Sequence, residues 1–225
     1  MIKEKNFDNG GINMDSYNRN YIKEEAKKML EGNWGKAIAV TIIIWILTDA
    51  FTQQNASESV RTGFYFSFLQ FGNLLSLILS GPLSLGAAYF YMKLEKTENV
   101  NISVIFEGFS DFKRTFLFHL VSGIFILLWT FLLVVPGIIA AIRYSMGYYL
   151  MAENPDLTFM EAIQVSSGIM NGNKMDFFIF FLSFIGWFFL SIITFGLGFL
   201  YLAPYYQMSK LNFYRRITST DYIAD

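Results

Sequence analysis

A break between two apolar runs near the middle of the chain constrains the fold most strongly. Residues 134–155 read VVPGIIAAIRYSMGYYLMAENP, and a Pro-Gly pair separates this run from the apolar run before it. The second run carries one charge, Arg143, with no acidic residue within nine positions on either side. An apolar segment of this length is typical of a membrane-spanning helix, so we expect a helix that returns through a lipid bilayer.

The composition indicates a membrane protein rather than an enzyme. Of the 225 residues, 54% are hydrophobic and 16% are charged, whereas soluble domains carry roughly 25% charged residues. The net charge of -1 provides no basic field for nucleic acid, and the chain has no cysteine and one histidine. No Gly-x-Ser-x-Gly, His-Glu-x-x-His or P-loop motif is present, so we expect no catalytic site, no metal and no cofactor.

Apolar runs predict six membrane-spanning helices and therefore an all-α, polytopic helix bundle. The runs cover about residues 34–51, 64–94, 115–135, 138–152, 177–195 and 199–214. The second is longer than one crossing and contains Gly81-Pro82, so it forms either one kinked helix or an interfacial segment followed by a span. Interfacial amphipathic helices are predicted at 16–31, at 103–108 and after the capping-box sequence at 158–161.

Three similar units follow one another along the chain. The turns LEGN, FEGF and MNGN, at residues 30–33, 106–109 and 170–173, each precede a spanning helix. We expect Gly32, in a left-handed conformation, and Gly172 to end the surface helices before them. We expect one membrane domain, 16–214, built from hairpin repeats at about 16–94, 102–152 and 158–214. A disordered tail, 1–15, and a short cytoplasmic tail, 215–225, are expected to flank this domain.

The lysine and arginine residues predict the orientation in the membrane. With six crossings, fifteen of these residues fall on the side of the termini, Arg61 falls on the other side, and Arg143 lies within a helix. This distribution predicts a protein of the cell membrane with both termini in the cytoplasm.

Arg143 is the strongest candidate for a site within the membrane. Three roles are open for its side chain. It forms a structural link to Asp49, to backbone carbonyls or to tyrosine hydroxyls; it extends to the outer lipid headgroups; or it binds an anionic ligand such as a lipid phosphate. Tyr89, Tyr144 and Tyr205 follow Pro82, Gly137 and Gly198 by seven residues and so occupy equivalent repeat positions. They either ring a common cavity or serve as aromatic packing.

Two functions stay open at this point. One is a non-enzymatic membrane module that binds membrane lipids or another membrane protein. The other is a transporter or channel for an anionic or amphiphilic solute, although the lack of carboxylates at membrane depth argues against coupling to protons or sodium. The sequence does not predict an oligomeric state.

Residues 134–214 also carry motifs of a known family. They are VPGII at 135–139, RYSM at 143–146, NP at 154–155, MNGNK at 170–174, SFIGW at 183–187 and PY at 204–205. With these motifs, and with residues 26–36, the chain resembles the bacterial multipass family called domain of unknown function 975, found mostly in Gram-positive bacteria. The resemblance implies location and topology but no activity. Ser167 stands where the family usually has the arginine of a Ser-Arg pair, which implies a weaker charge contact there. More distantly, the chain resembles the membrane domain that accompanies some glycerophosphodiester phosphodiesterases. This likeness implies a function related to lipids.

Overall fold

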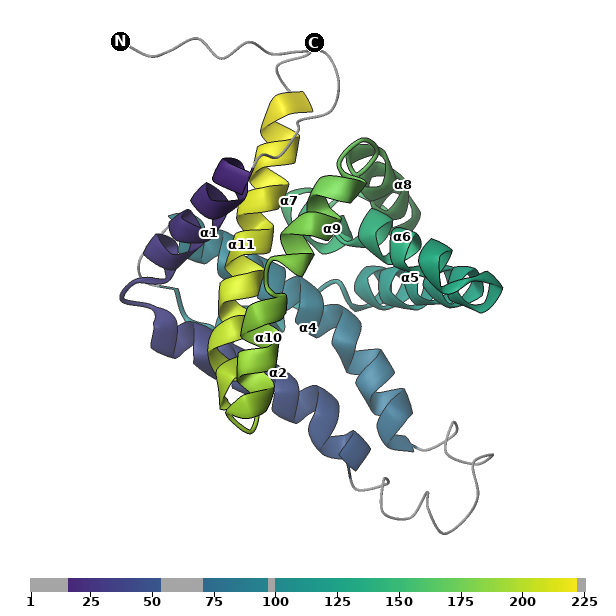
Figure 1. Ribbon diagram of the computed structural model, residues 1–225. Helices are drawn as coiled ribbons and strands as arrows, with labels where there is room; N and C mark the ends of the chain where they lie inside the picture. The colour runs from purple at the N-terminus through teal and green to yellow at the C-terminus, as the bar shows by residue number, and fades with distance from the viewer. Residues whose placement is uncertain (1–15, 54–70, 97–99, 222–225) are drawn as a thin grey trace.

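The computed structural model describes residues 16–53, 71–96 and 100–221, and every regular element in these ranges is a helix (Figure 1). This confirms the predicted all-α class. The elements are α1 (Ser16–Leu30), α2 (Trp34–Gln53), α4 (Phe71–Lys96), the 3₁₀ helix η2 (Ile102–Phe109), α5 (Phe112–Leu132), α6 (Val134–Tyr144), α7 (Gly147–Glu153), α8 (Phe159–Ile169), α9 (Lys174–Leu182), α10 (Ile185–Ile193) and α11 (Leu197–Asp221). The predicted tail 1–15 lies outside the described residues.

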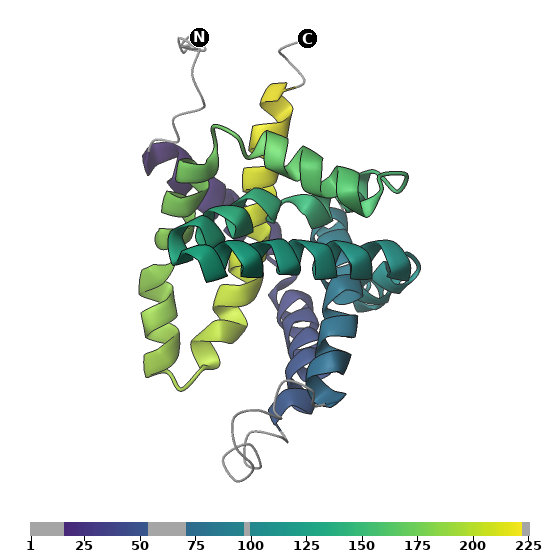
Figure 2. The same cartoon turned by 90° about the vertical axis from the view of Figure 1, so that its right-hand side faces the viewer.

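Helices that follow one another pack in pairs around a central α11. Helix α2 packs against α4, α5 against α6, and α10 against α11, while α8 covers α5, α6 and α7. Figures 1 and 2 show that the α5–α6 pair extends sideways, across the direction of α10 and α11. The largest buried cluster brings α11 together with α1, α2, α4, α7 and α9.

Three helical stretches of the described chain are long and apolar enough to cross a membrane. They are Leu75–Lys96, Phe112–Leu132 and Lys174–Ile193, and the last combines α9 and α10. A fourth arises if Arg19–Leu30 and Trp34–Thr48, which meet at a bend of 96°, form one span. Three or four spans are fewer than the six predicted. The difference arises because α6 ends after 11 residues and because α11 continues into a polar C-terminal half.

The turn predicted at Pro136-Gly137 lies elsewhere, and that prediction is wrong by a few residues. Leu133, in an extended conformation, alone connects α5 to α6. Pro136 lies in the first turn of α6, where a backbone nitrogen needs no helical partner. A Cβ on Gly137 would lie 2.0 Å from the Thr130 Oγ1 atom. The glycine therefore allows the two helices to meet closely directly after the turn.

The local signals that end and begin the surface helices are mostly confirmed. Gly32 and Gly172 follow α1 and α8 with φ angles of +76° and +90°, a conformation that glycine adopts without strain. Gly108 is different, because a Cβ there would lie 2.0 Å from the Pro82 carbonyl oxygen of α4. The predicted capping box at the start of α8 is present: the Thr158 hydroxyl accepts from the Glu161 N–H, and the Glu161 carboxylate accepts from the Thr158 N–H.

Candidate functional site

The helix that was predicted to carry Arg143 through the membrane is broken. Helix α6 ends at Tyr144 and α7 begins at Gly147, so residues 138–152 do not form one continuous helix. Ser166 of α8 lies fully buried at the break. Its hydroxyl donates to the Arg143 carbonyl oxygen at 2.7 Å and accepts from the Met146 N–H at 3.3 Å. Ser166 thus supplies partners that the backbone lost when the helix was interrupted.

The side chain of Arg143 binds the neighbouring serine of α8. Its Nε and Nη2 atoms donate to the Ser167 Oγ atom at 2.8 and 2.6 Å. The sequence-based hypotheses for Arg143 did not include Ser167 as a partner. The side chain of Asp49, which they did include, lies outside the described residues. Within the described part of the chain, no carboxylate pairs with Arg143. The contacts fit a structural link between α6 and α8, and among the described residues they give the positive charge no counter-ion.

The three repeat tyrosines have different neighbours. The Tyr89 hydroxyl lies near the Arg114 guanidinium group, and the Tyr144 ring lies 6.2 Å from the ring of Phe125. Tyr205 packs edge-on against Phe184 at 5.3 Å. Among the described ring contacts, none joins one of these tyrosines to another, so the structure does not bring the predicted set together.

A network that the sequence did not reveal joins the ends of the three returning helices. Arg215 of α11 donates from Nε and Nη2 to Glu95 of α4 at 3.0 and 2.8 Å, and from Nη1 to Glu153 of α7. The Tyr214 hydroxyl donates to the same Glu153 carboxylate. Helix α11 continues to Asp221, so residues 215–221 belong to the fold, and the predicted tail from residue 215 is wrong there. A usable signal was that a charged residue ends each returning helix.

The polar residues of α5 tie the middle hairpin to its neighbours. Arg114 forms an ion pair with Asp111 at 2.7 Å and donates to four carbonyl oxygens of residues 151–157, which follow or end α7. The positive charge of Arg114 is stabilised at this position by the negative, C-terminal end of the α7 dipole. Deeper in the helix, the His119 ring lies between the Ser80 hydroxyl at 2.9 Å and the Tyr148 hydroxyl at 2.8 Å. Both residues therefore have structural partners.

Helix α1 places cations on aromatic rings of the last hairpin. The Lys23 ammonium donates to the Ser183 carbonyl oxygen at 2.9 Å and lies 4.2 Å from the centroid of the Phe184 ring. Lys27, one turn further along, lies 5.4 Å from the centroid of the Tyr205 ring. Burial, followed by the positive charges of its neighbours on α1, lowers the pKa of Lys23 to about 8. These contacts hold the surface helix against α10 and α11.

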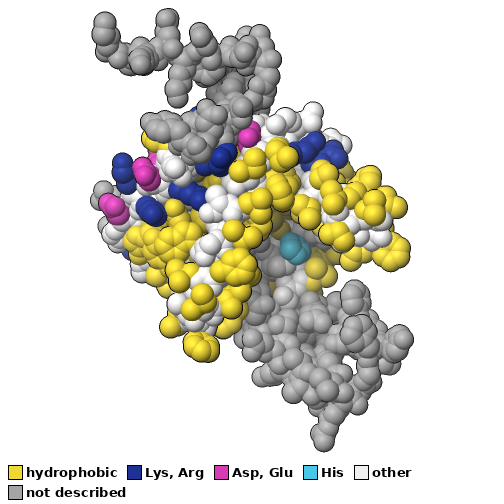
Figure 3. Space-filling view, viewed as in Figure 1, with side chains coloured by type: hydrophobic (Ala, Val, Ile, Leu, Met, Phe, Trp, Pro, Cys, Tyr) yellow, Lys and Arg dark blue, Asp and Glu magenta, His cyan; other side chains and the backbone are white. Residues whose placement is uncertain are grey.

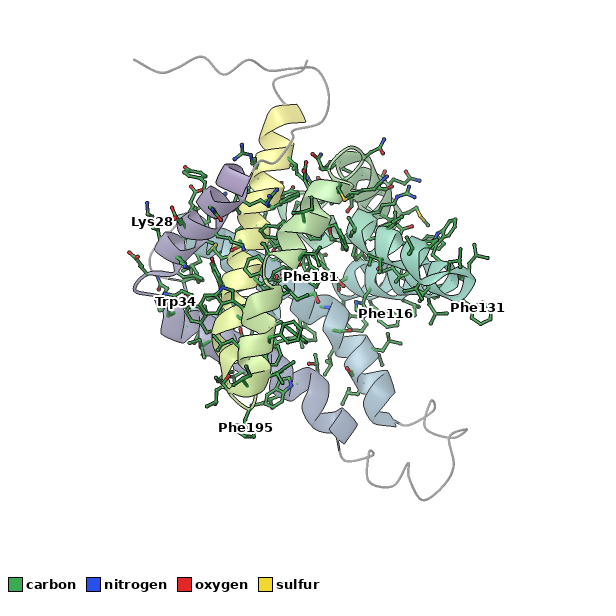
Figure 4. All side chains as sticks on the ribbon, in the orientation of Figure 1. Lys28, Trp34, Phe116, Phe131, Phe181 and Phe195 are labelled. Carbon is green, nitrogen blue, oxygen red and sulfur yellow. The ribbon has the colours of Figure 1, made fainter. Side chains whose placement is uncertain are left out.

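An apolar groove of about 350 Å³ lies beside this contact, between α9–α10 and α11 (Figure 4, where Phe181 is labelled). Its walls are the side chains of Phe181, Phe184, Ile185, Phe188, Phe199, Leu202, Ala203 and Tyr206. The groove lies between the two helices of the last hairpin. It has the chemistry of a site for a hydrocarbon chain.

Comparison with known proteins identifies the family but not an activity. The family model described as "Protein of unknown function (DUF975)" matches residues 14–142 and residues 130–221. No curated protein and no solved structure matches the chain. The more distant likeness to the membrane domain of glycerophosphodiester phosphodiesterases is not shown by these comparisons. Because the two matches together span nearly the whole sequence, the chain belongs to the DUF975 family of proteins of unknown function.

Proposed function

We propose that this protein is a multipass protein of the cell membrane that acts as a non-enzymatic lipid-binding module. The observation that carries the proposal is the separation of charged and apolar surface. Figure 3 shows the lysine, arginine and acidic side chains gathered toward the end of the molecule where α1 and α8 lie, and apolar side chains over the rest of the visible face. Phe131 and Phe195, labelled in Figure 4 at the tips of the α5–α6 and α10–α11 hairpins, are 91% and 100% exposed. A water-soluble monomer rarely exposes so large an apolar surface, and a bilayer would cover it.

The proposed topology is six crossings in three hairpins with both termini on the cytoplasmic side. The pairing of α2 with α4, α5 with α6 and α10 with α11 supports it. Each pair returns the chain to the side from which it started. The location of the termini is therefore the same whether the α5–α6 pair crosses the bilayer or lies along it. The basic residues of α1 and of the α11 end favour the cytoplasmic face for that side.

Lipid is the ligand that the geometry supports best. The groove beside α11 has only apolar walls apart from one tyrosine hydroxyl, and in a bilayer it would be surrounded by acyl chains. Positively charged residues of α1, α9 and α11 lie toward one end of the same hairpin. A hydrocarbon groove below a basic surface matches a membrane lipid better than it matches a polar solute.

Two measurements test the proposal. The full-length protein is extracted in a mild detergent, and lipids that remain bound are identified by mass spectrometry. We expect a defined lipid to be retained in a fixed ratio to protein, and retention no greater than that of empty micelles would refute lipid binding.

Reporter fusions at Asn55 and after Asp225 test the topology, and an extracellular C-terminus would refute it. If the Arg143 region proves accessible to water from both sides of the membrane, transport of an anionic or amphiphilic solute becomes the better explanation.

A further inference from the structure

We propose that the groove between α9–α10 and α11 binds an acyl chain of an anionic phospholipid whose phosphate lies against Lys210 and Lys174. This inference rests on the proposed lipid-binding function and names the site and the class of lipid. It follows from the shape of the groove, from the faces of the two helices that form its walls, and from the partners of the two lysines.

The groove has the size and the lining that a hydrocarbon chain requires. Its volume is about 350 Å³, which at about 30 Å³ per water-sized group corresponds to roughly a dozen such groups. Four of its eight lining residues are phenylalanines, and one, Tyr206, carries a polar atom. Such a lining binds a chain through apolar contact and offers no set of polar groups for a soluble metabolite.

The wall formed by α11 ends in a lysine. Phe199, Ala203 and Tyr206 line the groove at helical spacing, and Lys210 continues the same face one turn further on. Four residues of helix correspond to about 6 Å along the axis. Lys210 therefore stands just beyond the end of the groove that faces away from the apolar tip of the hairpin.

The opposite wall ends in a lysine as well. Phe188, Ile185 and Phe181 line the groove from α10 to α9, and Lys174 lies seven residues before Phe181, at the start of α9. Two helical turns correspond to about 10 Å. Because α9 and α11 run in opposite directions in this hairpin, Lys174 and Lys210 stand at the same end. The order of an apolar groove followed by two cations matches the order of acyl chain and phosphate in a phospholipid.

Neither lysine has a counter-ion among the described residues. The Lys174 ammonium donates to the Asn171 side-chain oxygen at 3.2 Å. Most of the Lys210 side chain is buried, and its ammonium lies 5.6 Å from the centroid of the Tyr149 ring. Within the described chain, the salt bridges involve other cations. A phosphate at this end of the groove would supply the negative charge that both ammonium groups lack. This charge complementarity is why we choose an anionic lipid over a neutral one or a second protein chain.

The test compares two lipids with the same acyl chains on the full-length protein. Phosphatidylglycerol and phosphatidylcholine are titrated into detergent-solubilised protein, and the bound fraction of each is measured by native mass spectrometry. We expect phosphatidylglycerol to bind about tenfold more tightly. The variants Lys210→Gln and Lys174→Gln should each remove several-fold of this preference. The matched control Lys96→Gln removes an exposed lysine at the end of α4 and should change nothing.

A second pair of variants tests the groove itself. Ala203→Trp should fill the groove and weaken both lipids, and Ala203→Leu, which disturbs the packing less, should do so to a smaller extent. Equal affinity for the two lipids, or an equal loss in the Lys96 control, would overturn the proposed phosphate site. Unchanged binding in both Ala203 variants would overturn the groove as the acyl-chain site. If the wild-type protein retains neither lipid, the proposed function fails as well, whereas wild-type affinity in the lysine variants refutes only the site.

Discussion

Removal of the Ser166 hydroxyl tests whether α8 holds the break between α6 and α7. Ser166 is fully buried, and its Oγ atom contacts the Arg143 carbonyl at 2.7 Å and the Met146 N–H at 3.3 Å. The variant Ser166→Ala keeps the size of the side chain nearly unchanged. It leaves one buried acceptor and one buried donor without these partners.

The expected loss of stability follows from these two contacts. A buried polar group without a partner costs about 1–3 kcal/mol. The 3.3 Å contact is long, so it contributes at the low end, and we expect a total of about 2–4 kcal/mol for Ser166→Ala. For a domain of this size each kcal/mol lowers the melting temperature by about 2–4 °C. The variant should therefore melt roughly 4–16 °C below the wild type.

The assay and its control use residues of the same region. The chain has no cysteine and four tryptophans, so unfolding in detergent is followed by tryptophan fluorescence rather than by a thiol dye. Ser145 lies in the same break, but its hydroxyl donates to the Ile142 carbonyl oxygen of its own turn. Ser145→Ala should therefore cost about 1 kcal/mol or less. A Ser166→Ala protein that melts within 2 °C of the wild type, or no lower than Ser145→Ala, would refute the role given to Ser166.

Three further predictions concern other parts of the fold. Gly108→Ala should destabilise the protein by more than about 2 kcal/mol, because a Cβ there would lie 2.0 Å from a carbonyl oxygen of α4. The control Gly123→Ala has open space around it and should be neutral or slightly stabilising. Equal melting temperatures for the two variants would contradict the close approach at Gly108. Arg215→Met should lower the melting temperature by a few degrees, because it leaves the carboxylates of Glu95 and Glu153 without their cation. A variant that melts at the wild-type temperature would contradict this role of Arg215. Burial lowers the pKa of Lys23 from 10.5 to about 8, so between these pH values the unfolded chain binds more protons than the folded one, and stability should rise with pH across that window. The free energy of unfolding of the wild type minus that of Lys23→Met, measured from pH 7 to 10.5, should therefore increase toward the alkaline end, and a constant difference would exclude this linkage.

Signals that act within a few residues predicted the local structure correctly. The capping box at Thr158 and Glu161 and the left-handed glycines after α1 and α8 depend on contacts within one helical turn. The same holds for the helical class, because the hydrogen bonds of a helix join residues four positions apart. An apolar composition adds that these helices need a non-aqueous surrounding. Each of these conclusions needs no knowledge of which helix lies next to which.

The candidate site could not be predicted in the same way. Arg143 was singled out correctly as an unusual charge, but its partner, Ser167, lies 24 residues away on another helix. The sequence also concealed the break behind Tyr144, since no proline or glycine marks its first residue, and an apolar run looks continuous whether or not its helix is. The buried backbone at the break is stabilised by Ser166 of α8, whose hydroxyl bonds to the Arg143 carbonyl and the Met146 N–H.

The amino-acid sequence by itself therefore determined the class of the protein, its family and the segments that become helices, because these depend on composition and on short-range periodicity. The tertiary structure decided which charges meet: Arg215 with Glu95 and Glu153, and Arg143 with a serine rather than a carboxylate. It also decided that the walls of one apolar groove are formed by α9, α10 and α11. The physical reason is that such contacts depend on the relative placement of whole helices, and this placement is set by packing over long separations in the sequence rather than by any local pattern.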